Sequence, residues 1–158
     1  LYAGGRIRAI GVSNFEPDQL LDLIAHNRMA PSVNQIETNL YCQRSTERSW
    51  LDKAQVAHMA YAPLGQGSRN EMYREPAVLA LAEKYGRTSA QILLRFLTQK
   101  SIAVIPRSTS PEHIQENFNL FDFALTTDEM AQLSSLDKRA PLIGRPETPE
   151  LVESSLAW

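Results

Sequence analysis

Four short apolar runs, each followed by a segment with helical periodicity, most constrain the fold of this chain. The runs cover residues 7–12, 33–36, 57–62 and 102–105. They lack the clean polar alternation of a sheet with one solvated face, which indicates strands covered on both sides. Strands that alternate with helices predict an α/β fold with a parallel sheet.

The helices are marked by proline starts, capping boxes and apolar faces. Pro17 opens the first helix, a second covers residues 46–55, and a third begins at Pro76 and ends at Gly86. Capping boxes open two more at 88–91 and 126–129, with one at Ser110-Pro111 between them. The residues predicted to face inward are Leu20, Leu21, Leu23, Ile24, Val78, Leu79, Leu81, Ala82, Ile92, Leu93, Phe96, Leu97, Met130, Leu133 and Leu136. Periodicity leaves two architectures open, a small doubly wound sheet and half of an eight-stranded βα barrel.

Composition argues against several classes of partner. A net charge of -2 gives no electrostatic basis for binding nucleic acid or an anionic membrane. No apolar run approaches the roughly 18 residues of a membrane span, and the first residues lack the pattern of a signal peptide. The single cysteine, Cys42, excludes an intramolecular disulfide and fits a cytoplasmic location. No metal-ligand cluster is present in the sequence.

Polar and aromatic residues stand at the ends of the first three predicted strands, where ligands bind in parallel α/β folds. Ser13, Asn14 and Gln35 carry groups that pair with a carboxamide. The ring of Tyr61 could lie against a planar heterocycle, and Gly65 permits close backbone approach. Each also has a structural interpretation, because Ser-Asn is common in turns and a strand-end tyrosine commonly packs.

The fourth segment predicts an anion site. Arg107, Ser108 and Thr109 stand between a strand and a helix N-terminus, where N–H groups and the helix dipole attract a phosphate. The structural alternative is that Ser110-Pro111 caps and starts the helix, which is compatible with a phosphate site. Further along, Glu116-Asn117 could bond to an adenine edge or form a solvated helix face.

Together the four segments resemble the aldo-keto reductase family over Arg6 to Asp137. The segments that carry the resemblance are Gly11-Val12-Ser13-Asn14-Phe15, Val33-Asn34-Gln35-Ile36-Glu37, Tyr61-Ala62-Pro63-Leu64-Gly65 and Ile105-Pro106-Arg107-Ser108, followed by Glu116-Asn117-Phe118. The resemblance implies a TIM barrel that binds NADP(H) in extended form. The chain would be the C-terminal half of that barrel, with a C-terminal loop over about 138–158. Within this loop, residues 142–158 would help to shape the substrate pocket.

The resemblance also implies binding roles. Ser13, Asn14 and Gln35 would hold the nicotinamide carboxamide, and Tyr61 would stack on the nicotinamide ring. Leu64 and Gly65 would line the pyrophosphate. The 2′-phosphate would be met by Arg107, Ser108, Thr109 and His113, and the adenine by Glu116 and Asn117. Departures from the family pattern are Ala62 for a common Ser, Gln66 for a small hydroxyl residue, and His113 for a frequent Arg. The histidine makes one phosphate contact weaker and pH-dependent. Arg107 still favours NADPH over NADH.

The family's catalytic tyrosine, lysine, aspartate and histidine would lie upstream of Leu1, so we expect no catalytic residue in this chain. Residues 1–5 are typical of a helix tail with a glycine stop, and we take residue 1 to be internal to a longer protein. The chain alone is expected to be inactive on the small-molecule carbonyl substrates of the family. Because half a barrel exposes sheet edges and an inner face, we expect it to pair with the missing N-terminal half or with another copy.

Two other functions stay open. The first is a non-catalytic module that binds NADPH and partners, which the upstream sequence would distinguish from an enzyme. The second is a flavodoxin-like domain, disfavoured because no Gly-rich or hydroxyl-rich phosphate loop follows the first strand.

Overall fold

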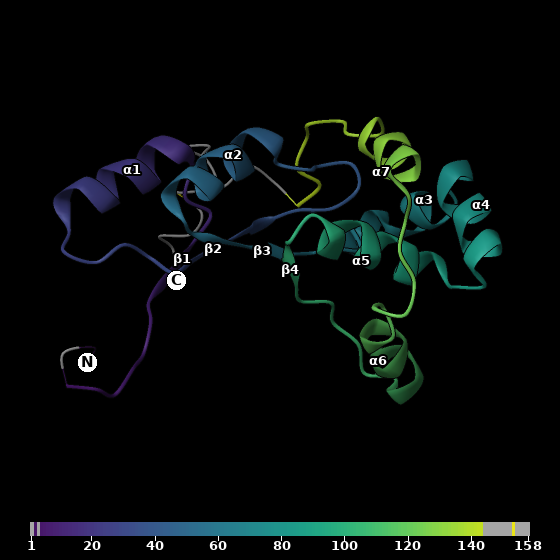
Figure 1. The fold of residues 1–158 in the computed structure, drawn as a ribbon, viewed down its shortest axis with the longest axis horizontal. Coiled ribbons are helices and arrows are strands. Elements are labelled where there is room, and N and C mark those ends of the chain that lie inside the picture. The colour runs from purple at the N-terminus through teal and green to yellow at the C-terminus, as the bar shows by residue number, and fades with distance from the viewer. Residues whose placement is uncertain (1, 3, 144–152, 154–158) are drawn as a thin grey trace.

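Strands and helices alternate along the chain in the computed structural model (Figure 1), which describes all residues except 1, 3, 144–152 and 154–158. The elements are β1 (Gly11–Ser13), α1 (Pro17–His26), β2 (Val33–Glu37), α2 (Ser45–Ala54), β3 (Ala57–Tyr61), the 3-10 helix η1 (Gln66–Ser68), α3 (Arg69–Tyr73), α4 (Pro76–Tyr85), α5 (Ser89–Gln99), β4 (Ala103–Val104), α6 (Pro111–Phe118) and α7 (Thr127–Ser134).

The four strands form one parallel sheet in the order β1-β2-β3-β4, so neighbours in space are neighbours in sequence. In register, Ser13 lies opposite Gln35, Gln35 opposite Met59, and Met59 opposite Ala103. Because the strands are parallel, their carboxyl ends meet at a single edge of the sheet. The parallel α/β prediction is confirmed.

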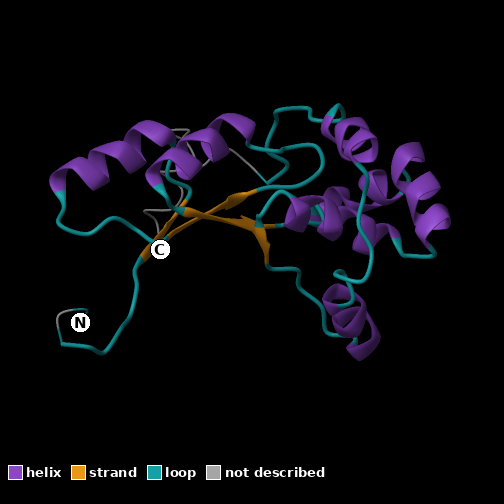
Figure 2. Ribbon diagram, viewed as in Figure 1, coloured by secondary structure: helices purple, strands orange, loops and turns teal. Residues whose placement is uncertain are grey.

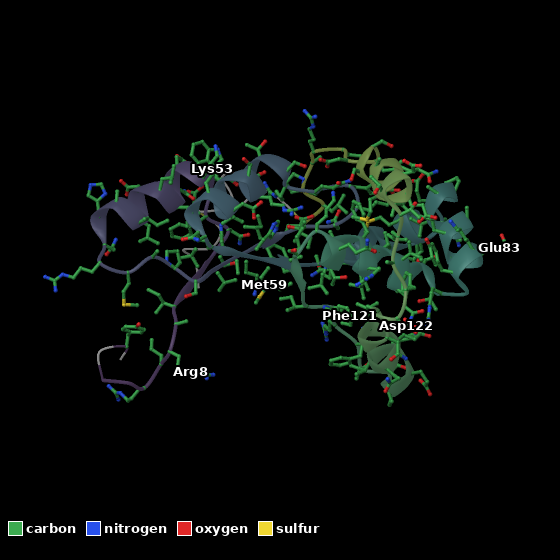
Figure 3. All side chains as sticks on the ribbon, viewed as in Figure 1. Arg8, Lys53, Met59, Glu83, Phe121 and Asp122 are labelled. Atoms are coloured by element: carbon green, nitrogen blue, oxygen red, sulfur yellow. The ribbon has the colours of Figure 1, made fainter. Side chains whose placement is uncertain are left out.

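The two faces of the sheet differ in burial. Alternate strand residues such as Ile36, His58 and Ala60 are buried, and α1 and α2 both lie on one side of the strands (Figure 2). The opposite face, which we call the open face, carries Ser13, Gln35, Met59, Tyr61 and Ala103, which are all at least partly exposed, whereas Glu37 at the end of β2 on this face is buried. The side chain of Met59 points away from α2 (Figure 3). Within the described residues, therefore, the expected covering of both faces is found on one face only.

Two separate hydrophobic clusters fill the helix side. The small core consists of Leu20, Ile36, Leu51 and Val56 under α1 and α2. The large core surrounds α5, whose four predicted inward residues are all buried, and its members include Met72, Val78 and Leu133 from α3, α4 and α7. The capping boxes at Thr88 and Thr126 form as predicted.

Some boundaries and faces predicted from the sequence are wrong. The first strand begins at Gly11 rather than at residue 7, because Pro31 precedes the facing strand and has no N–H to extend the ladder. Leu21 and Leu79 are 40% and 49% exposed, since each lies one residue beyond the buried stripe of its helix. The short helices between residues 66 and 73 were not predicted.

Candidate functional site

The turn after β1 is held by polar contacts with β2. Asn14 adopts a left-handed conformation with φ 58°, which asparagine tolerates, and its N–H donates to the carbonyl of Gln35 at 2.9 Å. The Ser13 hydroxyl donates to the same carbonyl at 2.9 Å. Buried Asn34 donates to the carbonyl of Phe15 at 2.8 Å and accepts its N–H at 3.4 Å. The turn is therefore fixed by side chains, and sequence reasoning had given Asn34 no separate role.

Gln35 and Tyr61 share the open face with Ser13. The Gln35 amide nitrogen lies 3.1 Å from the sulfur of Met59, a weak acceptor that a carbonyl oxygen could replace. Tyr61 is partly exposed, and burial together with the nearby charge of Glu37 raises the pKa of its phenol. An amide and an aromatic ring thus lie on adjacent strands at the carboxyl edge.

The loop after β3 turns sharply at Gly65. Its φ is 74°, and its N–H donates to the carbonyl of Ala62 at 2.9 Å. A Cβ at this position would overlap Cε of Met72 and would lie 3.5 Å from Cδ1 of Leu142. The positive φ thus favours glycine, and a Cβ would force the Met72 side chain to shift, while the approach of a ligand stays a prediction. Leu64 is partly buried against the large core.

Arg107 and Thr109 are exposed after β4, and Arg107 forms no salt bridge with any residue that the structure describes. The hydroxyl of Ser108 accepts the N–H of Ser110 at 3.1 Å. Ser110 is the N-cap of α6 and accepts the N–H of His113 at 3.4 Å. The capping alternative is therefore correct, and the guanidinium beside it stays available to an anion.

A carboxylate already lies at the N-terminus of α6. Glu112 accepts a hydrogen bond from the Ser110 hydroxyl at 2.6 Å, and this bond lowers the pKa of the glutamate. Its negative charge opposes a phosphate at the same place. The exposed side chains of Arg107 and His113 must outweigh it if an anion binds there.

Glu116 and Asn117 lie further along α6 and are partly buried. The helix is tied to α5 by Gln91, whose amide donates to the carbonyls of Glu116 at 3.3 Å and Asn119 at 3.0 Å. Sequence analysis found Gln91 only as part of a capping box. The structure therefore brings Ser13, Gln35 and Tyr61 together on the open face, places Arg107 at the same edge, and sets Glu116 and Asn117 on a separate helix (Figure 1).

Three other titratable side chains, those of Tyr41, Cys42 and His58, are buried and have structural roles. Burial and a 2.8 Å hydrogen bond to Glu75 raise the pKa of Tyr41 to about 12. Burial raises the pKa of the Cys42 thiol to about 11. His58 is buried, with Nε2 2.8 Å from the Thr38 hydroxyl, and burial lowers its pKa to about 4.

Glu37 is a site residue that sequence reasoning missed. It ends β2 and is 0% exposed. Its carboxylate accepts the backbone N–H of Leu142 at 2.6 Å and of Ile143 at 3.2 Å. The available signal was an acidic residue at the end of a buried strand, which demands hydrogen-bond donors.

The chain is an α/β protein with a parallel sheet, and polar side chains lie at the carboxyl edge, where ligands bind in sheets of this kind. The model of the aldo/keto reductase family matches residues 1–138, and the chain belongs to this family.

Two of the curated relatives that it matches are reductases of about twice its length. The chain is 42% identical to an aldo-keto reductase of Mycobacterium sp. (strain JLS) over 94% of its own length and 52% of that protein. It is 37% identical to the 9,11-endoperoxide prostaglandin H2 reductase of Trypanosoma cruzi, over 93% and 52%. The chain therefore spans about half the length of the curated relatives it matches.

Solved structures agree. A Bombyx mori aldo-keto reductase crystallised with NADP superposes with a TM-score of 0.86 at 33% identity, over 95% of this chain and 52% of that one. The parallel α/β fold thus matches the TIM barrels of this family. No helix in the described part of the chain is long and apolar enough to cross a membrane.

Proposed function

We propose that this chain supplies the C-terminal, NADP(H)-binding half of an oxidoreductase that reduces aldehydes or ketones to alcohols. One observation supports the proposal above all. The four strands are parallel neighbours in one sheet, so the four segments predicted to bind the cofactor lie side by side at the carboxyl edge of that sheet. The relatives crystallised with NADP or NADPH support the choice of cofactor.

The donors at this edge fit a dinucleotide. Ser13, Asn14 and Gln35 would hold the nicotinamide carboxamide. Because the sulfur of Met59 is a weak acceptor, the amide of Gln35 can exchange it for a carboxamide oxygen at little cost. Tyr61 would stack on the ring, and Leu64 with Gly65 would line the pyrophosphate. The nucleotide supplies the hydride when bound, and the residues of this chain bind and orient it.

The adenosine end would lie at the start of α6. Arg107, Ser108, Thr109 and His113 would meet the 2′-phosphate, and Glu116 with Asn117 would meet the adenine. Because Glu112 opposes the phosphate charge, the preference for NADPH over NADH rests chiefly on Arg107.

Titrating the full-length protein with each nucleotide, followed by tyrosine or tryptophan fluorescence, tests these roles. Arg107→Met should weaken NADPH binding about 10- to 100-fold, the worth of one charge-assisted hydrogen bond, and should leave NADH binding nearly unchanged. Arg28→Met is the matched control, because Arg28 is exposed in the turn before β2, at the opposite edge of the sheet. Equal losses for both nucleotides would contradict the assignment.

We propose further that the chain alone does not catalyse hydride transfer. By the family resemblance the catalytic tyrosine, lysine, aspartate and histidine lie outside this chain, and the pKa values of Tyr41, Tyr61 and Tyr85 are raised rather than lowered toward neutrality. The 158-residue chain should therefore bind NADPH without turnover, and the full-length protein should reduce an aldehyde. A full-length protein that binds NADPH but reduces no carbonyl would favour the non-catalytic module instead.

The open face and α6 support a partner for this half. No residue of α6 is buried, and Phe118 and Phe121 are both 72% exposed. The missing half of the barrel, or a second copy, would cover these surfaces. Sedimentation of the 158-residue chain should show self-association, and a stable monomer would contradict the proposal. The cytoplasmic location stays a prediction.

A further inference from the structure

A long-range polar contact at the carboxyl edge joins β2 to residues 142 and 143. Both carboxylate oxygens of buried Glu37 are used, Oε1 by the N–H of Leu142 and Oε2 by the N–H of Ile143. The amide of Asn39 adds a third donor at 3.2 Å. A carboxylate without solvent needs such donors, so the contact specifies where residues 142 and 143 lie.

Residues 137–143, which we call the strap, are held at further points. The N–H of Gln43 donates to the Asp137 carboxylate at 3.1 Å, and the N–H of Lys138 donates to the carbonyl of Tyr41 at 2.8 Å. Beyond Glu37, the Leu142 side chain packs against the large core beside Gly65. The strap therefore runs along the loop after β2 and reaches the loop after β3.

This path brings the strap close to Tyr61, the residue proposed to stack on the nicotinamide. Glu37 and Tyr61 are register partners at the ends of β2 and β3, on the same face of the sheet. The charge of Glu37 contributes to the raised pKa of Tyr61, which agrees with their proximity. The residue that anchors the strap is thus the direct neighbour of the residue proposed to stack on the nicotinamide.

We propose that Glu37 is a positioning residue for the substrate: it anchors Leu142 and Ile143 beside Tyr61 as one wall of the space where the carbonyl compound binds. This inference rests on the proposed function. Glu37 touches neither substrate nor cofactor in this role, and it acts through the backbone of the strap. Its loss should therefore alter substrate binding more than cofactor binding.

Glu37→Gln tests the role with little change of volume. A glutamine offers one acceptor oxygen and turns an NH₂ group toward the second N–H, so at least one of the two strap bonds is lost. In the full-length protein we expect the amides of Leu142 and Ile143 to exchange about tenfold faster. KM for the probe 4-nitrobenzaldehyde should rise about tenfold, the equivalent of one hydrogen bond. The Kd for NADPH should change less than twofold.

Glu83→Gln is the matched control, because Glu83 is exposed on α4 (Figure 3) and should change none of these quantities. Glu37→Asp keeps both acceptor oxygens and should restore part of the wild-type KM. Protection of the Leu142 and Ile143 amides in the wild-type protein is a test that needs no variant, and rapid exchange there would overturn the anchoring.

The outcomes separate this proposal from the proposed function. A full-length wild-type protein that reduces no aldehyde overturns the proposed function, and the substrate role of Glu37 with it. Wild-type reduction with unchanged KM in Glu37→Gln overturns the role of Glu37 alone. Equal changes in KM and in the Kd for NADPH would show a merely structural residue, and would also overturn it.

Discussion

Replacing Gly65 with alanine should destabilise this protein through its backbone conformation and through its contact with Met72. The residue has φ 74°, and the left-handed region costs an alanine about 1–2 kcal/mol. The new Cβ would also overlap Cε of Met72, which is buried in the large core. Overpacking of a core costs about 1–3 kcal/mol. We therefore expect the free energy of unfolding to fall by about 2–5 kcal/mol.

Urea unfolding of a glycine-to-alanine series separates the two contributions. Gly86 has φ 61° with nothing within 4 Å of its Cβ position, so Gly86→Ala measures the backbone cost alone, about 1–2 kcal/mol. Gly67 has open space and no positive φ, so Gly67→Ala should be nearly neutral. If Gly65→Ala costs no more than Gly86→Ala, Met72 moves aside freely and the packing argument is refuted.

A double variant sharpens the test. Met72→Ala alone leaves a cavity and should cost about 2–5 kcal/mol. Combined with Gly65→Ala it also removes the overlap, so the double variant should be about 1–3 kcal/mol more stable than the sum of the single changes predicts. Strict additivity would show that the two side chains do not compete for the same space.

Three further predictions concern titratable groups. Burial opposes ionisation of Glu129, but hydrogen bonds from Lys84 and Tyr85 lower its pKa to about 2. Because the Lys84 partner is largely exposed and solvent screens its charge, we expect a reduced loss of about 2 kcal/mol of stability as pH falls from about 4.5 toward 2. Glu129→Gln should show a flatter pH dependence in urea titrations. Buried His58 has its pKa lowered to about 4, so the unfolded state takes up the proton first. About 3 kcal/mol should be lost between pH 6.5 and 4, and His58→Gln should remove that slope. The raised pKa of Cys42 predicts iodoacetamide labelling at pH 8 at least about 100-fold slower than in urea, and rapid native labelling would show that it is accessible.

The local features of the fold were predictable because short-range chemistry determines them. A capping box needs residues only three positions apart, so Thr88 and Thr126 were found correctly. Apolar periodicity located α5 for the same reason. The exposed position of Leu79 was not predicted, because which leucines a helix buries depends on where its neighbours pack.

The candidate site also has a part that the sequence predicts and a part that it does not. The carboxyl-edge position of Ser13, Gln35 and Tyr61 follows from parallel strands and is confirmed by the register. Their contacts with a cofactor stay predictions. The bond between Glu37 and Leu142 joins residues 105 positions apart, and no local pattern indicates such a pair. Long-range polar contacts of this kind become visible only when the chain is folded.

Because the interior is divided into a small and a large core, we expect the β1 end and the β4 end of the sheet to unfold locally and independently of each other. Among the described residues, four buried side chains form the small core under α1 and α2, whereas thirteen form the large core around α5. Local opening should therefore reach residues 11–26 at a lower free energy than residues 89–99. Ser13 and Asn14 belong to the end that unfolds locally more easily. A nucleotide bound there would stabilise β1 against local unfolding, and it should slow amide exchange in β1 more than in α5.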